Sequence, residues 1–212
     1  MELEVSVTAG GPVAELGATS VPPQLVTAMA SHLGGCSLLG YRVTVTADGD
    51  GTDDPAHDLV DFGLLAEFLA AAEELGLPTW DTPGGHSVEI GPADPDQAPP
   101  WNRVFVLLSA QGPAGDRVLD AGRVLWLADR LGGEPHLLFG VRLRAERSLR
   151  LDDAVLSRAW ADGLRERFRA AAQEFGLPAW PVERVRISPA GHFPPAWTEE
   201  LDFRRRPAAP AT

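Results

Sequence analysis

The sequence contains no lysine and only one cysteine, Cys36. A single cysteine cannot form an intrachain disulfide, and it excludes zinc sites built from several cysteines. Its position between a predicted helix end and a predicted strand indicates a small buried residue. No apolar run approaches the roughly 18 to 20 residues that cross a bilayer, and the N-terminus lacks the basic patch and apolar run of a signal peptide. We therefore expect a cytoplasmic protein that makes no membrane contact.

Motifs that identify catalysis or cofactor binding by their spacing are also missing. The sequence has no HExxH, CxxC, GxSxG, GxxxxGK[ST] or GxGxxG, and its five histidines are scattered without a pair at metal-ligand spacing. We therefore expect no metal site and no cofactor. The sequence leaves open whether the protein is an enzyme.

Charge is distributed unevenly between the two halves of the chain. Residues 1–100 contain one arginine against sixteen aspartates and glutamates, a net formal charge of −15. Residues 101–212 contain seventeen arginines against fourteen acidic residues, a net charge of +3. Because phosphate binding depends on Lys and Arg, the acidic half argues against nucleic acid as a partner. An acidic surface favours association with a basic protein instead.

The chain contains an internal sequence repeat. Residues 63–80 are identical to residues 163–180 at eleven of eighteen positions, and the match extends upstream in the same order. This pattern indicates a duplication of about 100 residues. We expect an acidic first copy over 1–92, a Pro-rich linker over 93–100, an arginine-containing second copy over 101–190, and a C-terminal extension over 191–212 that ends in a disordered tail.

Each copy predicts the element order strand, helix, strand, helix, strand. Alternating apolar residues predict strands at 3–7, 41–47 and 86–91 and at 103–110, 137–145 and 182–188. Apolar residues at helical spacing predict helices at 22–35 and 54–76 and at 120–133 and 152–176, with glycines at their ends. We expect an α+β protein (an α/β sandwich) of two tandem βαβαβ-type repeats, related to the ferredoxin-like architecture and packed with pseudo-twofold symmetry.

Positions at which the two copies differ are candidates for function. The long helix of the first copy carries Leu65 and Leu69, where the second copy carries Arg165 and Arg169. These leucines give the first copy a second apolar stripe beside its core-facing side, which we expect to be covered by protein. The cover is either the second copy or a partner molecule, so Leu65 and Leu69 form a candidate partner face.

Aromatic residues suggest a second kind of site. Each copy places a tryptophan and a histidine near its last strand: Trp80 and His86 in the first copy, Trp180 and His192 in the second. If the copies face each other, these four residues are candidates to line a ligand cleft between them. Tryptophans are large and apolar, so we also expect the six in this chain to lie in the core or at an interface.

The loop Asp48–Asp54 has acidic residues at alternate positions, as calcium-binding loops do. Its sixth position is Asp53 instead of glycine, and its twelfth is Leu59 instead of glutamate. We interpret the loop as a solvated turn and helix cap, and the sequence leaves a weak cation site open.

Residues 40–49, GYRVTVTADG, and residues 59–69, LVDFGLLAEFL, together resemble a strand and a following DFG-x-L segment. This pair is similar to a segment of the 6-pyruvoyl-tetrahydropterin synthase family, whose members have a tunnelling fold. The family's zinc-binding histidines would flank the strand, but Leu38, Leu39 and Gly40 stand there. The resemblance therefore implies neither zinc nor a pterin for this chain.

Two functions remain compatible with the sequence. The first is a non-catalytic interaction protein (an inhibitor, an immunity-type protein or an accessory subunit) that uses the acidic copy and the Leu65/Leu69 stripe to bind a protein partner or a second copy of itself. The alternative is a small-molecule-binding protein or enzyme with a cleft between the copies.

Overall fold

The computed structural model describes residues 2–13, 20–48, 57–81, 85–93, 103–146, 154–190 and 199–202. Within these ranges the helices are α1 (Pro23–His32), α2 (His57–Glu74), α3 (Ala121–Leu131) and α4 (Ala154–Glu174). The strands are β1 (Glu2–Pro12), β2 (Cys36–Asp48), β3 (His86–Pro92), β4 (Arg103–Pro113), β5 (Gly133–Glu146), β6 (Val182–Pro189) and β7 (Glu199–Asp202). The predicted α+β class and the predicted order of helices and strands are confirmed, and β7 is an additional strand. None of the described helices combines the length and the apolar character that crossing a membrane requires.

All the described strands form one antiparallel sheet in the order β3-β4-β2-β5-β1-β6-β7. The strands of the two chain halves interleave in it: β1 pairs with β5 and β6, while β4 pairs with β2 and β3. This arrangement differs from two ferredoxin-like sheets placed side by side. The physical reason is that the first strand of each half lies between the second and third strands of the other half, so among β1–β6 no two strands of the same half pair with each other.

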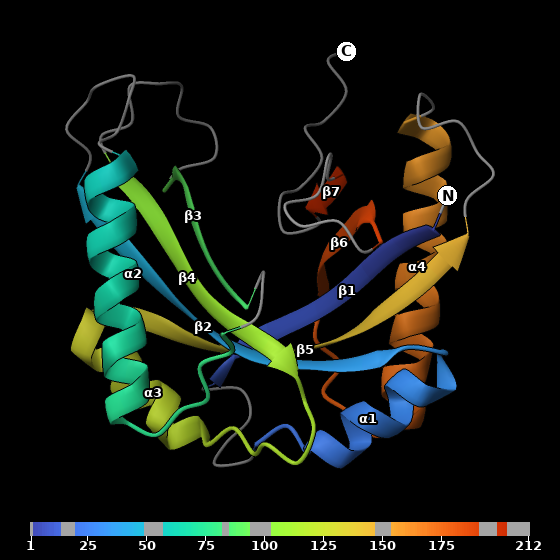
Figure 1. The fold of residues 1–212 in the computed structure, drawn as a ribbon, viewed down its shortest axis with the longest axis horizontal. Helices are drawn as coiled ribbons and strands as arrows, with labels where there is room; N and C mark the ends of the chain where they lie inside the picture. The colour runs from blue at the N-terminus through green and yellow to red at the C-terminus, as the bar shows by residue number, and fades with distance from the viewer. Residues whose placement is uncertain are drawn as a thin grey trace.

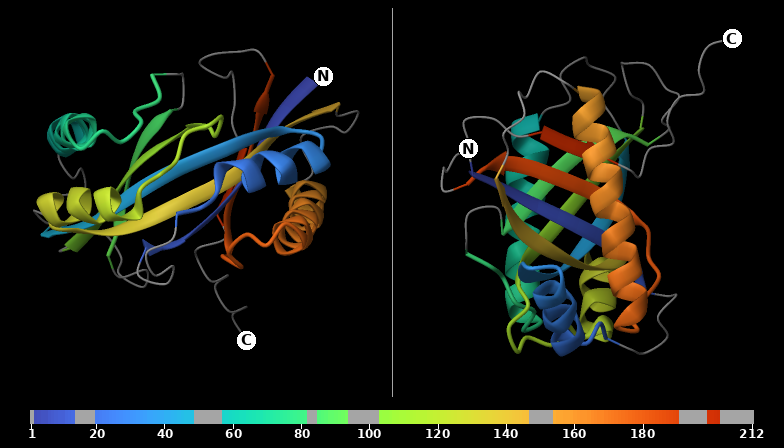
Figure 2. Two further views of the ribbon diagram at one scale, coloured as in Figure 1. Left: turned by 90° about the horizontal axis from the view of Figure 1, so that it is seen from below. Right: turned by 90° about the vertical axis from the view of Figure 1, so that its right-hand side faces the viewer.

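The sheet curls, with the helices on its outer, convex side (Figures 1 and 2). Figure 1 shows α2 and α4 on the two outer flanks, with α3 at the lower left near α2 and α1 at the lower right on the side of α4. Alternate strand residues point to opposite faces, and the apolar residues of the helix-covered face form one core with all four helices. Tyr41 of β2 contacts Phe68 of α2, and Phe139 of β5 contacts Phe168 of α4.

The repeated segment acts as a core helix followed by a stop, as its sequence predicts. Gly76 and Gly176 end their helices with φ angles of 66° and 68°, which side-chain-bearing residues rarely adopt. The chain then turns and inserts a tryptophan under the sheet. A Cβ atom on Gly112 would lie 2.1 Å from the ring of Trp80, and one on Gly11 would lie 2.3 Å from the ring of Trp180. Each tryptophan therefore packs against a glycine of a strand from the other chain half.

The concave face of the sheet has little room for side chains near its centre. A Cβ atom on Gly40 would lie 2.6 Å from the carbonyl oxygen of Ala110, and one on Gly140 would lie 2.4 Å from that of Val7. Real Cβ contacts are essentially never this short. Glycine is therefore needed at these strand positions, where backbone approaches backbone closely. The curl leaves a polar hollow over these glycines.

One expectation about a single residue is wrong. Cys36 is exposed rather than buried, because it is the first residue of β2 and lies at the end of the strand. Trp126 is 66 % exposed, because it lies on the outer side of α3, away from the buried Val124 and Leu127. The other described tryptophans are buried or partly buried. The structure does not describe the acidic loop after Asp48, Trp101, Trp197 or the C-terminal tail after Asp202.

Candidate functional site

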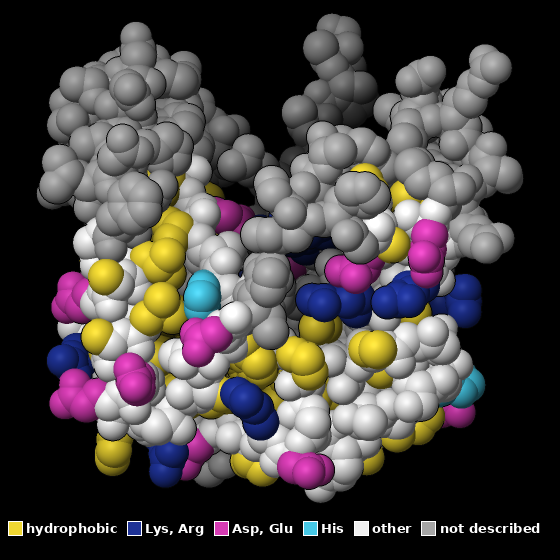
Figure 3. All heavy atoms as spheres, in the orientation of Figure 1, with side chains coloured by type: hydrophobic (Ala, Val, Ile, Leu, Met, Phe, Trp, Pro, Cys, Tyr) yellow, Lys and Arg dark blue, Asp and Glu magenta, His cyan; other side chains and the backbone are white. Residues whose placement is uncertain are grey.

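A polar cleft lies on the concave face of the sheet, opposite the helices. It encloses about 40 Å³, and its walls come from six of the seven strands. Figure 3 shows arginine side chains crossing the right half of the face drawn, on the side where β1 and β5 lie. The residues that line the cleft are Ser6, Thr8, Arg42, Ser87, Glu89, Ser109, Gln111, Leu138, Glu183, Arg184 and Arg186.

The register of the sheet brings the polar residues into rows. Arg42 of β2 lies opposite Ser109 of β4 on one side and His136 of β5 on the other. Ser87 of β3 continues this row beyond Ser109. Directly opposed residues of an antiparallel pair point to the same face, with Cβ atoms roughly 4.5–5.5 Å apart. Hydroxyl and guanidinium groups from β2, β3 and β4 therefore stand side by side in the cleft, and His136 of β5 extends the row on the other side of Arg42.

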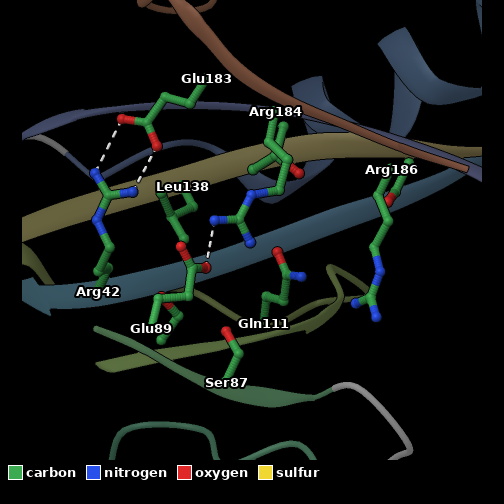
Figure 4. A pocket seen from close by; sticks show the side chains of 11 residues that line it. Arg42, Ser87, Glu89, Gln111, Leu138, Glu183, Arg184 and Arg186 are labelled. Carbon is green, nitrogen blue, oxygen red and sulfur yellow. Dashed lines mark hydrogen bonds and ion pairs between the residues drawn. The ribbon is translucent and has the colours of Figure 1, made fainter. Parts of the chain in front are cut away.

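Arg42 and Glu183 form a buried ion pair at one end of the cleft (Figure 4). The two guanidinium nitrogens of Arg42 donate to the two carboxylate oxygens of Glu183 at 2.5 and 2.9 Å. The side chains are only 7 % and 13 % exposed. The fork-to-fork geometry is the strongest kind of protein ion pair. It ties β2 to β6, although two strands, β5 and β1, separate them in the sheet.

A second ion pair closes the cleft from side to side. Arg184 of β6 donates to Glu89 of β3, and both side chains are mostly buried. Four strands lie between β3 and β6 in the sheet, so the curl must bring these two distant strands to within side-chain reach. Figure 4 shows this bridge beside Leu138 and Gln111. The Arg184–Glu89 bridge thus helps to hold the sheet in its curled form.

His136 is kept neutral by its surroundings. Burial lowers its pKa, and the neighbouring positive charge of Arg42 lowers it further. Glu183, Glu134 and a backbone hydrogen bond at Glu134 act in the opposite direction and do not reverse the shift. Its buried Nδ1 atom has no hydrogen-bond partner among the described residues. A neutral imidazole therefore lies beside the Arg42–Glu183 ion pair.

We expect stability to fall on mild acidification because of His136. The pKa of a histidine in the unfolded chain is about 6.5, and the folded pKa is lower. Between these two values the unfolded chain binds more protons, so the free energy of unfolding decreases as pH falls below about 6.5. Urea denaturation of the wild type and of His136→Gln at several pH values measures this. An equally steep loss in the variant over that window would contradict it.

Of the predicted ligand residues, the three that the structure describes do not line this cleft. Trp80 and Trp180 are buried beneath the opposite face of the sheet, in separate aromatic clusters with Tyr41 and Phe139. His86 lies at the start of β3, with its Nε2 atom 4.0 Å from Asp81. Its register partner, the buried Ala110, places it on the helix-covered face. His192 lies outside the described residues.

The candidate partner face is partly covered by the chain itself. Leu65 and Leu69 are partly buried and pack against the core. Figure 3 shows a column of hydrophobic side chains alongside α2. At the corresponding positions of α4, Arg165 and Arg169 form ion pairs with acidic residues of the same helix. The two helices thus present different outer surfaces.

Sequence reasoning missed every residue of the polar cleft. Its members are serines, arginines and glutamates in alternating strands, which resemble the solvated face of any antiparallel sheet. The one available signal was the arginine and glutamate content of residues 182–188, in a strand where the first copy is mostly neutral. Within the described residues, no group of three or more His, Cys, Asp or Glu side chains could hold a metal ion.

Comparisons with known proteins add no family to this description. No protein-family model matches the chain, and no curated protein sequence matches it. The fold and the cleft therefore carry the functional argument.

Proposed function

We propose that this protein binds a small polar molecule in the concave cleft. The observation that carries the proposal is a hollow lined by hydroxyl, amide, guanidinium and carboxylate groups from both chain halves. Binding sites use a few well-placed polar groups to orient a ligand. Ser87 and Gln111 offer such groups beside the two ion pairs (Figure 4), and Ser109 also lines the cleft. The proposal concerns binding and assigns no reaction.

We also propose that the cleft arose by duplication, with the two halves related by a pseudo-twofold axis. The first six strands have the order β3-β4-β2-β5-β1-β6 in the sheet. If β1 is exchanged with β4, β2 with β5 and β3 with β6, this order becomes β6-β1-β5-β2-β4-β3, which is the same order read backwards. A twofold axis through the middle of the sheet has this effect. The pairs Trp80/Gly112 and Trp180/Gly11 correspond in the same way. An experimental structure tests this: superposing 103–189 on 2–92 should require a twofold rotation and should overlay these pairs. A clearly different rotation would contradict it.

The duplication explains why the cleft carries both signs of charge. If β3 and β6 are equivalent strands, Val88 and Ile90 correspond to Val185 and Ile187. Glu89 then corresponds to Arg186, and Ser87 corresponds to Arg184. The core positions have stayed the same, while the concave positions have changed charge. Such a divergence is expected if the two copies contribute different polar groups to one ligand site.

A variant that fills the cleft tests the proposed binding. Ser109 is only 9 % exposed on the cleft floor, so Ser109→Leu should occupy the hollow. Thr46→Leu is the control, because Thr46 is exposed on the same face of β2 outside the cleft. A panel of small polar metabolites is screened by equilibrium dialysis. We expect at least one compound to bind the wild type and Thr46→Leu and to be lost in Ser109→Leu. Binding that survives in Ser109→Leu, or no binding at all, would contradict the proposal.

The exposed apolar residues of α3 and of the segment just before it favour a second candidate, a protein-interaction function. Val118, Leu125 and Trp126 are 63 %, 40 % and 66 % exposed. Apolar residues of this size, together with the Leu65/Leu69 face of the neighbouring α2, are typical of interaction surfaces. Leu65→Arg with Leu69→Arg, which copies the second half, tests it. The variant should remain folded and lose a complex seen by sizing. An unchanged apparent mass would remove this candidate.

A further inference from the structure

Arg186 is the arginine of the cleft whose charge the described part of the chain does not neutralise. The cleft is lined by three arginines and two glutamates. Arg42 is paired with Glu183, and Arg184 is paired with Glu89. No described carboxylate lies within ion-pair distance of Arg186, and Figure 4 shows its guanidinium apart from both pairs. The described part of the lining therefore has a surplus of one positive charge, located at one end.

The residues around Arg186 form a place for an oxyanion. Ser6 of β1 is the register partner of Arg186 on β6 and of Arg142 on β5. A hydroxyl thus stands between two arginines in one row across three adjacent strands, within cross-strand contact distance. Thr8 and Arg184 form the next row along the same strands. Arg142 is 3.4 Å from Glu4, so its charge is already balanced.

We propose that the ligand carries a carboxylate that binds to Arg186 and Ser6. The inference rests on the proposed function, and it names the chemical class of the group that enters this end of the cleft. The planar fork of arginine binds a carboxylate through two parallel hydrogen bonds. One free positive charge matches one negative charge. A doubly charged phosphate would bring an uncompensated charge into a half-buried site, which is unfavourable.

Titration with acetate tests the carboxylate site directly. The protein is labelled with ¹⁵N-arginine, and the Nε–Hε signal of Arg186 is identified by its loss in Arg186→Gln. Acetate is added at constant ionic strength against chloride. In the wild type we expect a saturable shift of the Arg186 signal and of the signal of Arg184 in the same cleft. In Arg186→Gln, binding followed at the Arg184 signal should be weaker by about tenfold or more, because a hydrogen bond to a charged group is lost. Arg144→Gln is the control, since Arg144 is 77 % exposed on β5 outside the cleft and should leave acetate binding unchanged.

A second variant tests whether an acidic residue of the neighbouring strand β7 neutralises Arg186. Glu200 of β7 is the outer register partner of Arg186. The Glu200→Gln variant should bind acetate at least as tightly as the wild type. If acetate binds only to Glu200→Gln, the charge of Arg186 is already neutralised by Glu200 in the wild type, and the proposal is overturned. Tighter binding of inorganic phosphate than of acetate, under mildly alkaline conditions, would overturn the choice of a carboxylate.

The two proposals fail in different ways. If acetate does not bind but an uncharged metabolite binds and is lost in Ser109→Leu, the carboxylate site is wrong and the cleft remains a binding site. If acetate binds with dependence on Arg186, the carboxylate site is supported. If nothing binds in a manner that Ser109→Leu abolishes, both proposals are wrong.

Discussion

Replacing Glu183 with alanine should lower the free energy of unfolding by roughly 3–5 kcal/mol, the cost of leaving a buried charge without its partner. Arg42 is 6 % exposed, and both of its terminal nitrogens donate to Glu183. Without that carboxylate the guanidinium would remain charged in a poorly solvated place. Urea denaturation followed by far-UV circular dichroism measures the change. A loss below about 1 kcal/mol, the value typical of a surface pair, would show that the pair is solvated.

Two control variants separate the burial of the pair from its charge. Glu166→Ala removes an exposed partner of Arg169 on α4, so it should change stability by less than about 1 kcal/mol. The double variant Arg42→Met with Glu183→Leu removes both charges and fills similar volume. It should recover most of the stability, because buried ion pairs contribute little beyond apolar packing. A double variant as unstable as Glu183→Ala would show that packing rather than charge is responsible.

Truncating either buried tryptophan should cost about 3–5 kcal/mol, as large aromatic truncations in cores do. Trp80 and Trp180 are 4 % and 8 % exposed, and each ring lies against a glycine of the sheet. Removing the ring leaves a void that the backbone at Gly112 or Gly11 can fill only by moving. Thermal and urea denaturation of Trp80→Ala and Trp180→Ala measure the loss.

The exposed Trp126 supplies a matched control for the same substitution. Because it is 66 % exposed, Trp126→Ala should change the free energy of unfolding by less than about 0.5 kcal/mol. Losses of similar size at Trp80 and Trp180 are expected if the two sites are equivalent. A large loss at one and a negligible loss at the other would argue against equivalent roles for the two halves.

Local patterns in the sequence predicted the helices and strands, because each element has its own periodicity and end signals. The core face of the repeated helix is one example: Phe68 and Phe168 are both fully buried or nearly so, as their spacing indicates. The sequence also predicted that the two long helices end at Gly76 and Gly176, and that a tryptophan after each end packs into the core. These features depend on neighbours within a few turns, which a single sequence contains.

The sheet order could not be read from the sequence. The strands of both halves have similar alternating patterns, so β1 fits beside β2 as well as beside β5 by periodicity alone. The cleft depends on that order and on the curl, which together bring Glu89 to Arg184 and Arg42 to Glu183. Arg42 and Glu183 are 141 positions apart in the sequence, and Glu89 and Arg184 are 95 positions apart. Contacts over such separations leave no local pattern in the sequence. The tryptophans drew attention because they are chemically conspicuous, whereas the cleft is built from common polar residues.

The measurement that tests the central claim most directly is chemical-shift mapping with the tightest ligand from the dialysis panel. A ¹H–¹⁵N correlation spectrum reports every backbone amide and the indole of Trp126 at once. If the ligand enters the cleft, the largest shifts should fall at the concave positions of β1, β2, β4 and β6, around Thr8, Arg42, Ser109 and Arg184. Shifts confined to α2 and α3 and to the Trp126 indole, with these strands unchanged, would contradict the account.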